Sequence, residues 1–295
     1  MNVGDLYAAG AALLWSFSVI LMRVAGYQIP PLPLTFFKSF VALFFLLTVL
    51  ILLGEPLFVD LSGSAYLRLF ISGAIGISVA DAMIAASLNR LGASLQALAD
   101  CAYTPTITLV GFFMFGEMLS AWEIIGGLLV VSGVFVGAVL KAEATTKKDL
   151  MIGILLAATA HAIMGVGILI VRDIYREESV VWVTSFRFLV AVLAMLVYGC
   201  FRFSGNLKSR LFLGFYRVDM WRTIIPMAIL GPFLATLFWV AGFKYLEAGR
   251  AAIYNQLSTI FIILLAYFLL GETLTKRKML GVVLAIAGAS IVAFQ

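Results

Sequence analysis

The stretch GEMLSAWEIIGGLLVVSG, residues 116–133, returns near the end of the chain as GETLTKRKMLGVVLAIAG, residues 271–288. A shift of 155 residues superimposes the two copies, and the same shift aligns residues 76–133 without a gap. The coinciding glycines are Gly116 and Gly271, Gly126 and Gly281, and Gly133 and Gly288. Self-similarity of this length indicates that the chain contains two copies of one structural unit.

A second block extends the repeat toward the N-terminus of each half. TFFKSFVA at 35–42 aligns with TSFRFLVA at 184–191 under a shift of 149 residues, so that Lys38 matches Arg187. The difference between the two shifts indicates a longer loop in the second half, around residues 202–220. We expect a first repeat over 1–140, a linker over 141–149 and a second repeat over 150–295.

The composition indicates a membrane protein. Hydrophobic residues make up 63% of the chain, charged residues 12%, and the mean hydropathy is +1.11. A soluble protein must cover itself with polar side chains, whereas about 20 apolar residues are enough to span a bilayer. The spans that we predict are approximately 5–26, 34–53, 67–88, 91–115, 120–140, 150–171, 180–201, 221–244, 248–270 and 276–294. We interpret the first as a helix because it lacks the basic start and cleavage site of a signal peptide.

The predicted fold is therefore an all-α integral membrane protein with ten transmembrane helices. Five helices per repeat is an odd number, so the second repeat enters the membrane inverted relative to the first. Inverted repeats commonly enclose a site near the membrane midplane and expose it to each side in turn. The architecture favours a secondary transporter.

The Gly-Glu pairs, the glycine spacing after them and the Phe-Lys or Arg starts at 37 and 186 resemble the EamA-type repeat of the drug/metabolite transporter superfamily. The segment GASLQALADCAYTP, residues 92–105, is further similar to bacterial aromatic amino acid exporters of that superfamily. The chain departs from the Trp-Gly pair that many members carry in the first helix of each half, with Trp15-Ser16 and His161-Ala162 in these regions. The resemblance implies export of small amphipathic metabolites, above all aromatic amino acids, through a multi-pass protein of the bacterial inner membrane.

Other functions stay open at this stage. The substrate could belong to another class, such as other amino acids, drugs or nucleotide sugars. A membrane-embedded enzyme is less favoured because the sequence lacks H-E-x-x-H, a G-x-S-x-G elbow and a Walker A motif. A structural subunit would not need polar residues repeated at depth. We expect no cofactor, no metal and no nucleic-acid partner, and the chain could be a monomer or a dimer.

The orientation follows from the basic residues. Of the 20 Lys and Arg residues, fourteen fall to the loops on one side and six to the side of the termini. By the positive-inside rule, both termini are predicted to lie outside the cytoplasm. Without an ATP site, transport would use proton coupling or the gradient of the substrate itself.

Polar residues inside the apolar runs are the candidates for the site. Asp100 aligns with Asn255 under the 155-residue shift, and helical spacing places Gln96, Asp100, Tyr103 and Thr104 on one face. A charge at the centre of a membrane helix needs water or a partner, so Asp100 is expected to face a cavity. The predicted substrate-binding residues are Trp15, Asp81, Gln96, Asp100, Tyr103, His161, Trp239, Tyr254 and Asn255.

Several of these candidates have a structural alternative. Asn255 and the threonines could equally hold helices together. Asp81, whose counterpart is Thr236, is expected to pair with Lys38 rather than with a substrate amine. His161 is more simply a hydrogen-bonded structural residue than a proton relay. For Lys38 and Arg187 we favour side chains that extend to the interface over ones that gate the cavity or attract a carboxylate.

The Gly-Glu motif itself has a structural explanation. Gly116 can end one helix in a left-handed conformation, and Ser120 with Glu123 can cap the next as S-x-x-E. Gly133 and Gly137 form a GxxxG pair suited to close helix packing.

Overall fold

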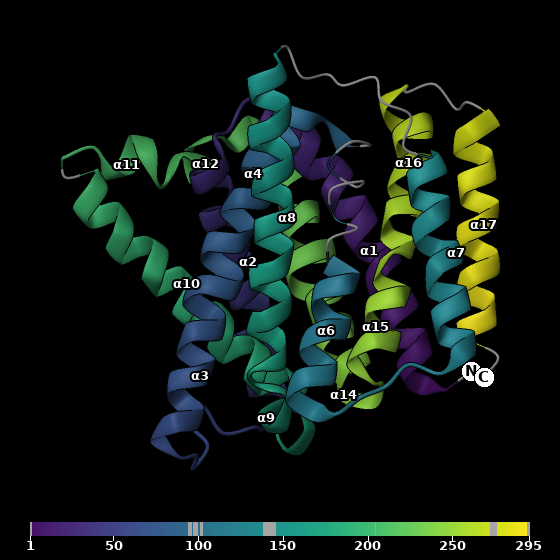
Figure 1. Ribbon diagram of the computed structural model, residues 1–295. Coiled ribbons are helices and arrows are strands. Elements are labelled where there is room, and N and C mark those ends of the chain that lie inside the picture. The colour runs from purple at the N-terminus through teal and green to yellow at the C-terminus, as the bar shows by residue number, and fades with distance from the viewer. Residues whose placement is uncertain are drawn as a thin grey trace.

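The computed structural model describes residues 2–93, 96, 100, 103–137, 146–203, 205–271 and 276–293. Within these residues the regular structure is entirely helical (Figure 1). The first half holds α1 Val3–Gly26, α2 Pro31–Leu52, α3 Gly63–Gly73, η1 Ala74–Val79, α4 Ala80–Leu91, α6 Tyr103–Phe115 and α7 Ala121–Gly137. The second half holds α8 Lys147–Leu169, α9 Arg172–Glu177, α10 Val180–Arg202, α11 Leu207–Arg210, α12 Leu213–Tyr216, η3 Val218–Met220, α13 Trp221–Ala228, η4 Ile229–Ala235, α14 Thr236–Tyr245, α15 Ala248–Asn255, α16 Leu257–Leu270 and α17 Lys276–Ala293.

Among the residues that the structure describes, seven helical segments are long and apolar enough to cross a membrane. They are Val3–Gly26, Pro31–Leu52, Gly63–Leu91, Lys147–Leu169, Val180–Arg202, Val218–Tyr245 and Ala248–Leu270. Three shorter apolar helices, Thr106–Phe115, Ala121–Gly133 and Met279–Gly288, lie in the remaining predicted spans, 91–115, 120–140 and 276–294. These three spans and the predicted linker 141–149 fall partly outside the described residues. The all-helical, multi-pass prediction is supported, while the count of ten stays a prediction.

The outer surface of the helices is apolar. Leu52, Phe113 and Phe201 are 80%, 79% and 85% exposed on the isolated chain. A soluble monomer seldom exposes many large apolar side chains of this kind together, and contact with lipid tails explains them.

The Gly-Glu motif ends one helix and starts the next, as predicted. Gly116 and Gly271 have φ of +66° and +70°, a conformation that favours glycine. The backbone N–H of Ser120 donates to Glu123 Oε2 at 2.8 Å, and the N–H of Glu123 donates to Ser120 Oγ at 3.2 Å. This reciprocal capping box opens α7.

The repeated glycines bring the last helices of the two halves together. Helices α7 and α17 lie side by side at one edge of the molecule (Figure 1). A Cβ atom on Gly288 would lie 2.4 Å from the carbonyl oxygen of Gly126, so the two backbones touch without side chains between them. Such close approach requires a small residue.

The third helix of each half is interrupted at matching places. The π-helical segments η1 and η4 begin 155 residues apart and lie between ordinary α-helices. In η4, Pro232 supplies no backbone N–H. Each interrupted helix also bonds to the first helix of the other half, through Ser72 Oγ to the carbonyl of Gly167 and Ser18 Oγ to the carbonyl of Met227. The two halves are therefore interlocked reciprocally.

Both termini lie at the same end of the bundle (Figure 1). Ion pairs join the halves at this end, and we refer to the three closest of them as the terminal latch. They are Asp5 with Arg250 at 3.0 Å, Arg68 with Asp173 at 2.7 Å, and Glu117 with Arg172. Glu117 also accepts the N–H of Ala248 at 2.8 Å, at the start of α15. The structural role that we expected for the first Gly-Glu motif is thus borne out in detail, while Glu272 lies outside the described residues.

Candidate functional site

A cavity between the two halves contains most of the predicted site residues. The empty space within it is about 820 Å³, which includes the part that is open to the outside. Its walls come from α1, η1 and α4 of the first half and from α8, α10, η4, α14 and α15 of the second, together with Asp100 and Tyr103. Seven of the nine predicted residues line it: Trp15, Asp81, Asp100, Tyr103, His161, Trp239 and Asn255.

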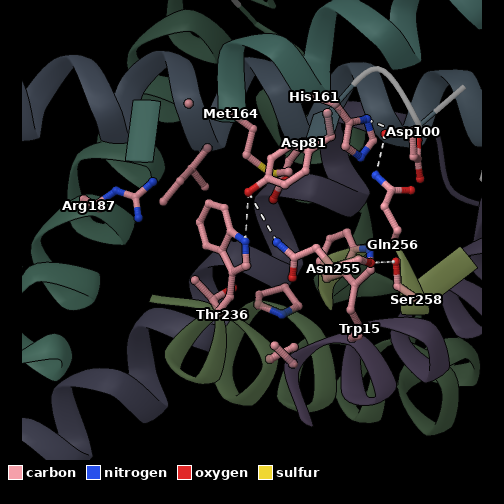
Figure 2. A pocket seen from close by; sticks show the side chains of 18 of the residues that line it. Trp15, Asp81, Asp100, His161, Met164, Arg187, Thr236, Asn255, Gln256 and Ser258 are labelled. Carbon is pink, nitrogen blue, oxygen red and sulfur yellow. Dashed lines mark hydrogen bonds and ion pairs between the residues drawn. The ribbon is translucent and has the colours of Figure 1, made fainter. Parts of the chain in front are cut away.

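Asp100 lies at one end of the cavity with hydrogen-bonding partners around its carboxylate (Figure 2). His161 Nδ1 is 3.1 Å from Asp100 Oδ1 and 2.9 Å from the carbonyl oxygen of Ala157. The amide of Gln96 donates to both carboxylate oxygens at 3.0 and 3.3 Å. These contacts offset the cost of holding Asp100, which is 8% exposed, away from bulk water.

Tyr103 connects the two halves across the cavity. Its hydroxyl oxygen accepts from Trp239 Nε1 at 3.1 Å and from Asn255 Nδ2 at 3.3 Å (Figure 2). Its ring meets the ring of His161 edge-on, with centroids 6.2 Å apart. Aromatic faces held by hydrogen bonds form a rigid wall against which a planar solute can pack.

A break in the ninth predicted span positions Asn255. Helix α15 ends at this residue, α16 begins at Leu257, and Gln256 lies between them. The Gln256 side chain donates to Thr104 Oγ1 at 2.8 Å, and Thr104 Oγ1 donates to the carbonyl of Ala252 at 3.2 Å. Thr104 therefore holds helices together, whereas Asn255 both lines the cavity and donates to Tyr103 of the other half.

Asp81 is committed to an ion pair. Lys38 Nζ lies 2.6 Å from Asp81 Oδ2, so the pairing expected from the sequence is confirmed. Lys38 is 1% exposed and lies over the Trp15 ring at 5.6 Å from its centroid. The prediction that Lys38 extends to the interface is wrong, because a carboxylate inside the bundle holds it there.

Two predicted residues do not line the cavity. Gln96 is 1% exposed and lies behind Asp100, which it supports through hydrogen bonds. Tyr254 is 4% exposed and packs in the main hydrophobic cluster with Ile253. Neighbouring helix positions point in different directions, and Asn255 rather than Tyr254 takes the cavity side.

The sequence interpretation did not favour Arg187 as a cavity residue, although it named this role as the alternative. Arg187 is fully buried and lines the cavity, so the prediction that it extends to the interface is also wrong. A signal was available, because Arg187 matches Lys38 while the position that matches Asp81 holds Thr236. A basic residue without its partner in the repeat is a candidate for binding.

Metal chemistry finds no support in the described part of the chain. No group of three or more His, Cys, Asp or Glu side chains there is arranged to hold a metal ion. Cys200 is exposed on the outer surface, and Cys101 lies outside the described residues.

A family model matches the chain twice, over residues 2–138 and 151–294. The chain belongs to the EamA-like transporter family. The EamA-like fold is also found in a solved crystal structure that is 18% identical, with a TM-score of 0.77 over 99% of this chain and 96% of that one. A comparison with curated proteins finds no match. The EamA-like chain is therefore a multi-pass membrane transporter of the drug/metabolite superfamily, built from two repeats.

Proposed function

We propose that this EamA-like chain is a secondary transporter that exports small amphipathic metabolites, above all aromatic amino acids, across a bacterial inner membrane. Ten helices in two inverted repeats would rock around the central cavity and open it to each side in turn. The observation that carries the proposal is the cavity itself, in which Trp15, Tyr103 and Trp239 surround buried polar groups. Such walls suit a solute with a flat apolar body and a polar end.

Asp100 and Asn255 would hold a polar group of this solute, and Tyr103 and Trp239 its ring. Tyr254 is left out of the site because its side chain is turned into the core. Asp81 is left out of direct binding because Lys38 occupies its carboxylate. The shape and chemistry of the cavity support this arrangement.

Transport by the purified protein tests the proposal. Liposomes that contain only this chain are loaded with labelled phenylalanine or tryptophan. Release of the labelled amino acid is compared with its release from loaded liposomes that contain no protein. We expect faster release of both amino acids, with competition by unlabelled tyrosine. Movement of sugars or nucleotide sugars without movement of aromatic amino acids would contradict the substrate class and leave the family assignment intact.

A further inference from the structure

We propose that the Arg187 guanidinium is the anchor for a carboxylate of the transported solute. This inference rests on the proposed transport function and adds the chemical class of the substrate: aromatic carboxylates. The three nitrogens of this side chain have different surroundings. Nε donates to Ser72 Oγ at 2.8 Å, whereas Nη1 and Nη2 have no hydrogen-bond partner among the residues that the structure describes.

An unpaired guanidinium is costly at this depth. Arg187 is 0% exposed, and a buried cation without a counter-ion loses its hydration without compensation. The side chain is fixed by Ser72, whose hydroxyl in turn donates to the carbonyl of Gly167. The two free Nη groups form the end of the fork, which is the geometry that receives a carboxylate through two parallel hydrogen bonds.

The repeat explains why this cation is free. In the first half, Lys38 is neutralised by Asp81 at 2.6 Å. In the second half, Arg187 matches Lys38 but Thr236 stands at the position of Asp81, and both Arg187 and Thr236 line the cavity. The second half has therefore kept the cation of the pair without its internal anion.

The other carboxylate in the cavity lies away from Arg187. Figure 2 shows Arg187 at one end of the drawn residues and Asp100 with His161 at the other. Asp100 is already in contact with His161 and Gln96. The solute carboxylate therefore binds at Arg187 with its ring along Trp239 and Tyr103, and where the far edge of the ring carries a donor, as in tyrosine or tryptophan, that donor reaches Asp100.

A single guanidinium fits a carboxylate better than a phosphate. A phosphate monoester carries about −1.5 to −2 charges at neutral pH, and one cation would leave part of this charge uncompensated in a medium of low dielectric. A carboxylate carries one charge and presents two oxygens to the two Nη groups.

The test measures binding of four probes to the purified full chain in lipid nanodiscs. The probes are phenylalanine, 3-phenylpropionate, phenylethylamine and phenyl phosphate. The wild-type chain is expected to bind the two carboxylates at least about tenfold more tightly than phenylethylamine, which lacks the carboxylate. Arg187→Gln is expected to weaken 3-phenylpropionate binding by about tenfold to a hundredfold and leave phenylethylamine unchanged. Arg187→Lys should retain part of the preference because it retains the charge.

Two further variants keep the test independent of folding. Thr236→Asp restores the internal carboxylate and should abolish the preference for carboxylates although Arg187 is still present. Thr236→Asn is the neutral control and should keep the preference for carboxylates. The melting temperature of the empty Arg187→Gln protein should stay equal or rise, because a buried unpaired charge has been removed. A purely structural Arg187 would lower it.

The inference is overturned if 3-phenylpropionate fails to bind the wild-type chain or binds Arg187→Gln equally well. Phenyl phosphate that binds more than tenfold more tightly than 3-phenylpropionate would overturn the carboxylate class. The proposed function fails separately: binding of carboxylates that depends on Arg187, without transport of any aromatic amino acid, refutes the function and upholds the anchor. Transport of aromatic amino acids at the wild-type rate by Arg187→Gln refutes the anchor and upholds the proposed function.

Discussion

Asp100 is tolerated in an apolar segment because its carboxylate meets donors inside the protein and faces a cavity. A carboxylate at the middle of a membrane helix costs about 2.5–3.5 kcal/mol on insertion. Gln96 and His161 contact it, and the cavity gives it access to a polar solute. The contacts of Asp100 therefore offset the cost of its burial, and the cavity leaves its carboxylate available for binding.

Substitution of Asp100 separates these two roles. Asp100→Asn keeps the shape and the hydrogen-bonding capacity, so we expect an unchanged melting temperature and a loss of transport of at least about tenfold, the effect of removing a charged hydrogen bond. Asp100→Leu should insert at least as readily and also fail to transport. Uptake and melting are measured on the same purified variants. Normal transport by a folded Asp100→Leu would rule out a functional role.

At the residue scale, the sequence predicted which polar residues lie at depth better than it predicted the direction in which individual side chains point. The repeat placed Asp100 and Asn255 at related depths, and both line the cavity. It also predicted the pair of Lys38 with Asp81. Arg187 was assigned to the interface because a basic residue near the start of an apolar run is usually interfacial, and hydropathy does not reveal which way a side chain turns. Tyr254 was misplaced because one helical position decides between cavity and core.

At the element scale, the paired glycines allow helix contacts that no larger residue permits. Gly288 faces the backbone of α7, with the Gly126 carbonyl 2.4 Å from where its Cβ would lie. Backbone atoms cannot rotate away from a new methyl group as a side chain can. The separation of α7 from α17 is therefore set by a glycine of the repeat.

Gly288→Ala tests this contact. The added methyl group forces α17 away from α7, and overpacking of this kind costs about 1–3 kcal/mol. We expect a lower melting temperature in detergent. Gly63→Ala is the matched control, because a Cβ at Gly63 meets nothing within 4 Å. Equal melting temperatures for the two variants would show that α17 adapts freely.

The existence of most helices followed from apolar runs, but their interruptions did not. Hydropathy averages over many residues and reads Gly63–Leu91 as one span, although η1 lies inside it. Hydropathy likewise does not reveal the break between α15 and α16. The side chain of Gln256 stabilises this break through a hydrogen bond to Thr104, which lies in another segment. Such features depend on contacts between segments far apart in the chain, which a local pattern cannot encode.

At the scale of the whole molecule, the terminal latch holds the two halves together at one end of the bundle. All three of its ion pairs join the first half to the second. Both termini lie at this end, in keeping with an even number of crossings (Figure 1). If the halves rock as proposed, opening the cavity toward this end would separate the latch, and these ion pairs would set the balance between the two orientations.

Loss of one latch pair should favour opening toward the termini. Arg172→Gln removes the partner of Glu117, and we expect a cysteine placed at the cavity residue Ala12, in a background without Cys101 and Cys200, to react faster with an impermeant thiol reagent from that side. The rise should be several-fold, since a partly buried ion pair contributes about 1 kcal/mol or more. Arg90→Gln is the control, because the exposed Arg90 side chain donates to the carbonyl of Ala86 in its own helix. A labelling rate equal to that of the control would exclude the latch as a gate.

The two π-helical segments have a further mechanical consequence. Each holds a surplus residue compared with an α-helix of the same length. Asp81 lies two residues beyond η1, and Thr236 directly follows η4. Passing one residue out of such a segment turns the rest of the helix by about 100° and advances it by about 1.5 Å. A slip of one residue in η1 would thus rotate Asp81 away from Lys38, and a slip in η4 would rotate Thr236 away from the wall of the cavity. The one surplus residue in each π-helical segment therefore fixes the direction in which Asp81 or Thr236 points. A combined rotation and translation of the helix beyond the segment would change the side chains that face the interior, while the rest of the helix stays hydrogen-bonded.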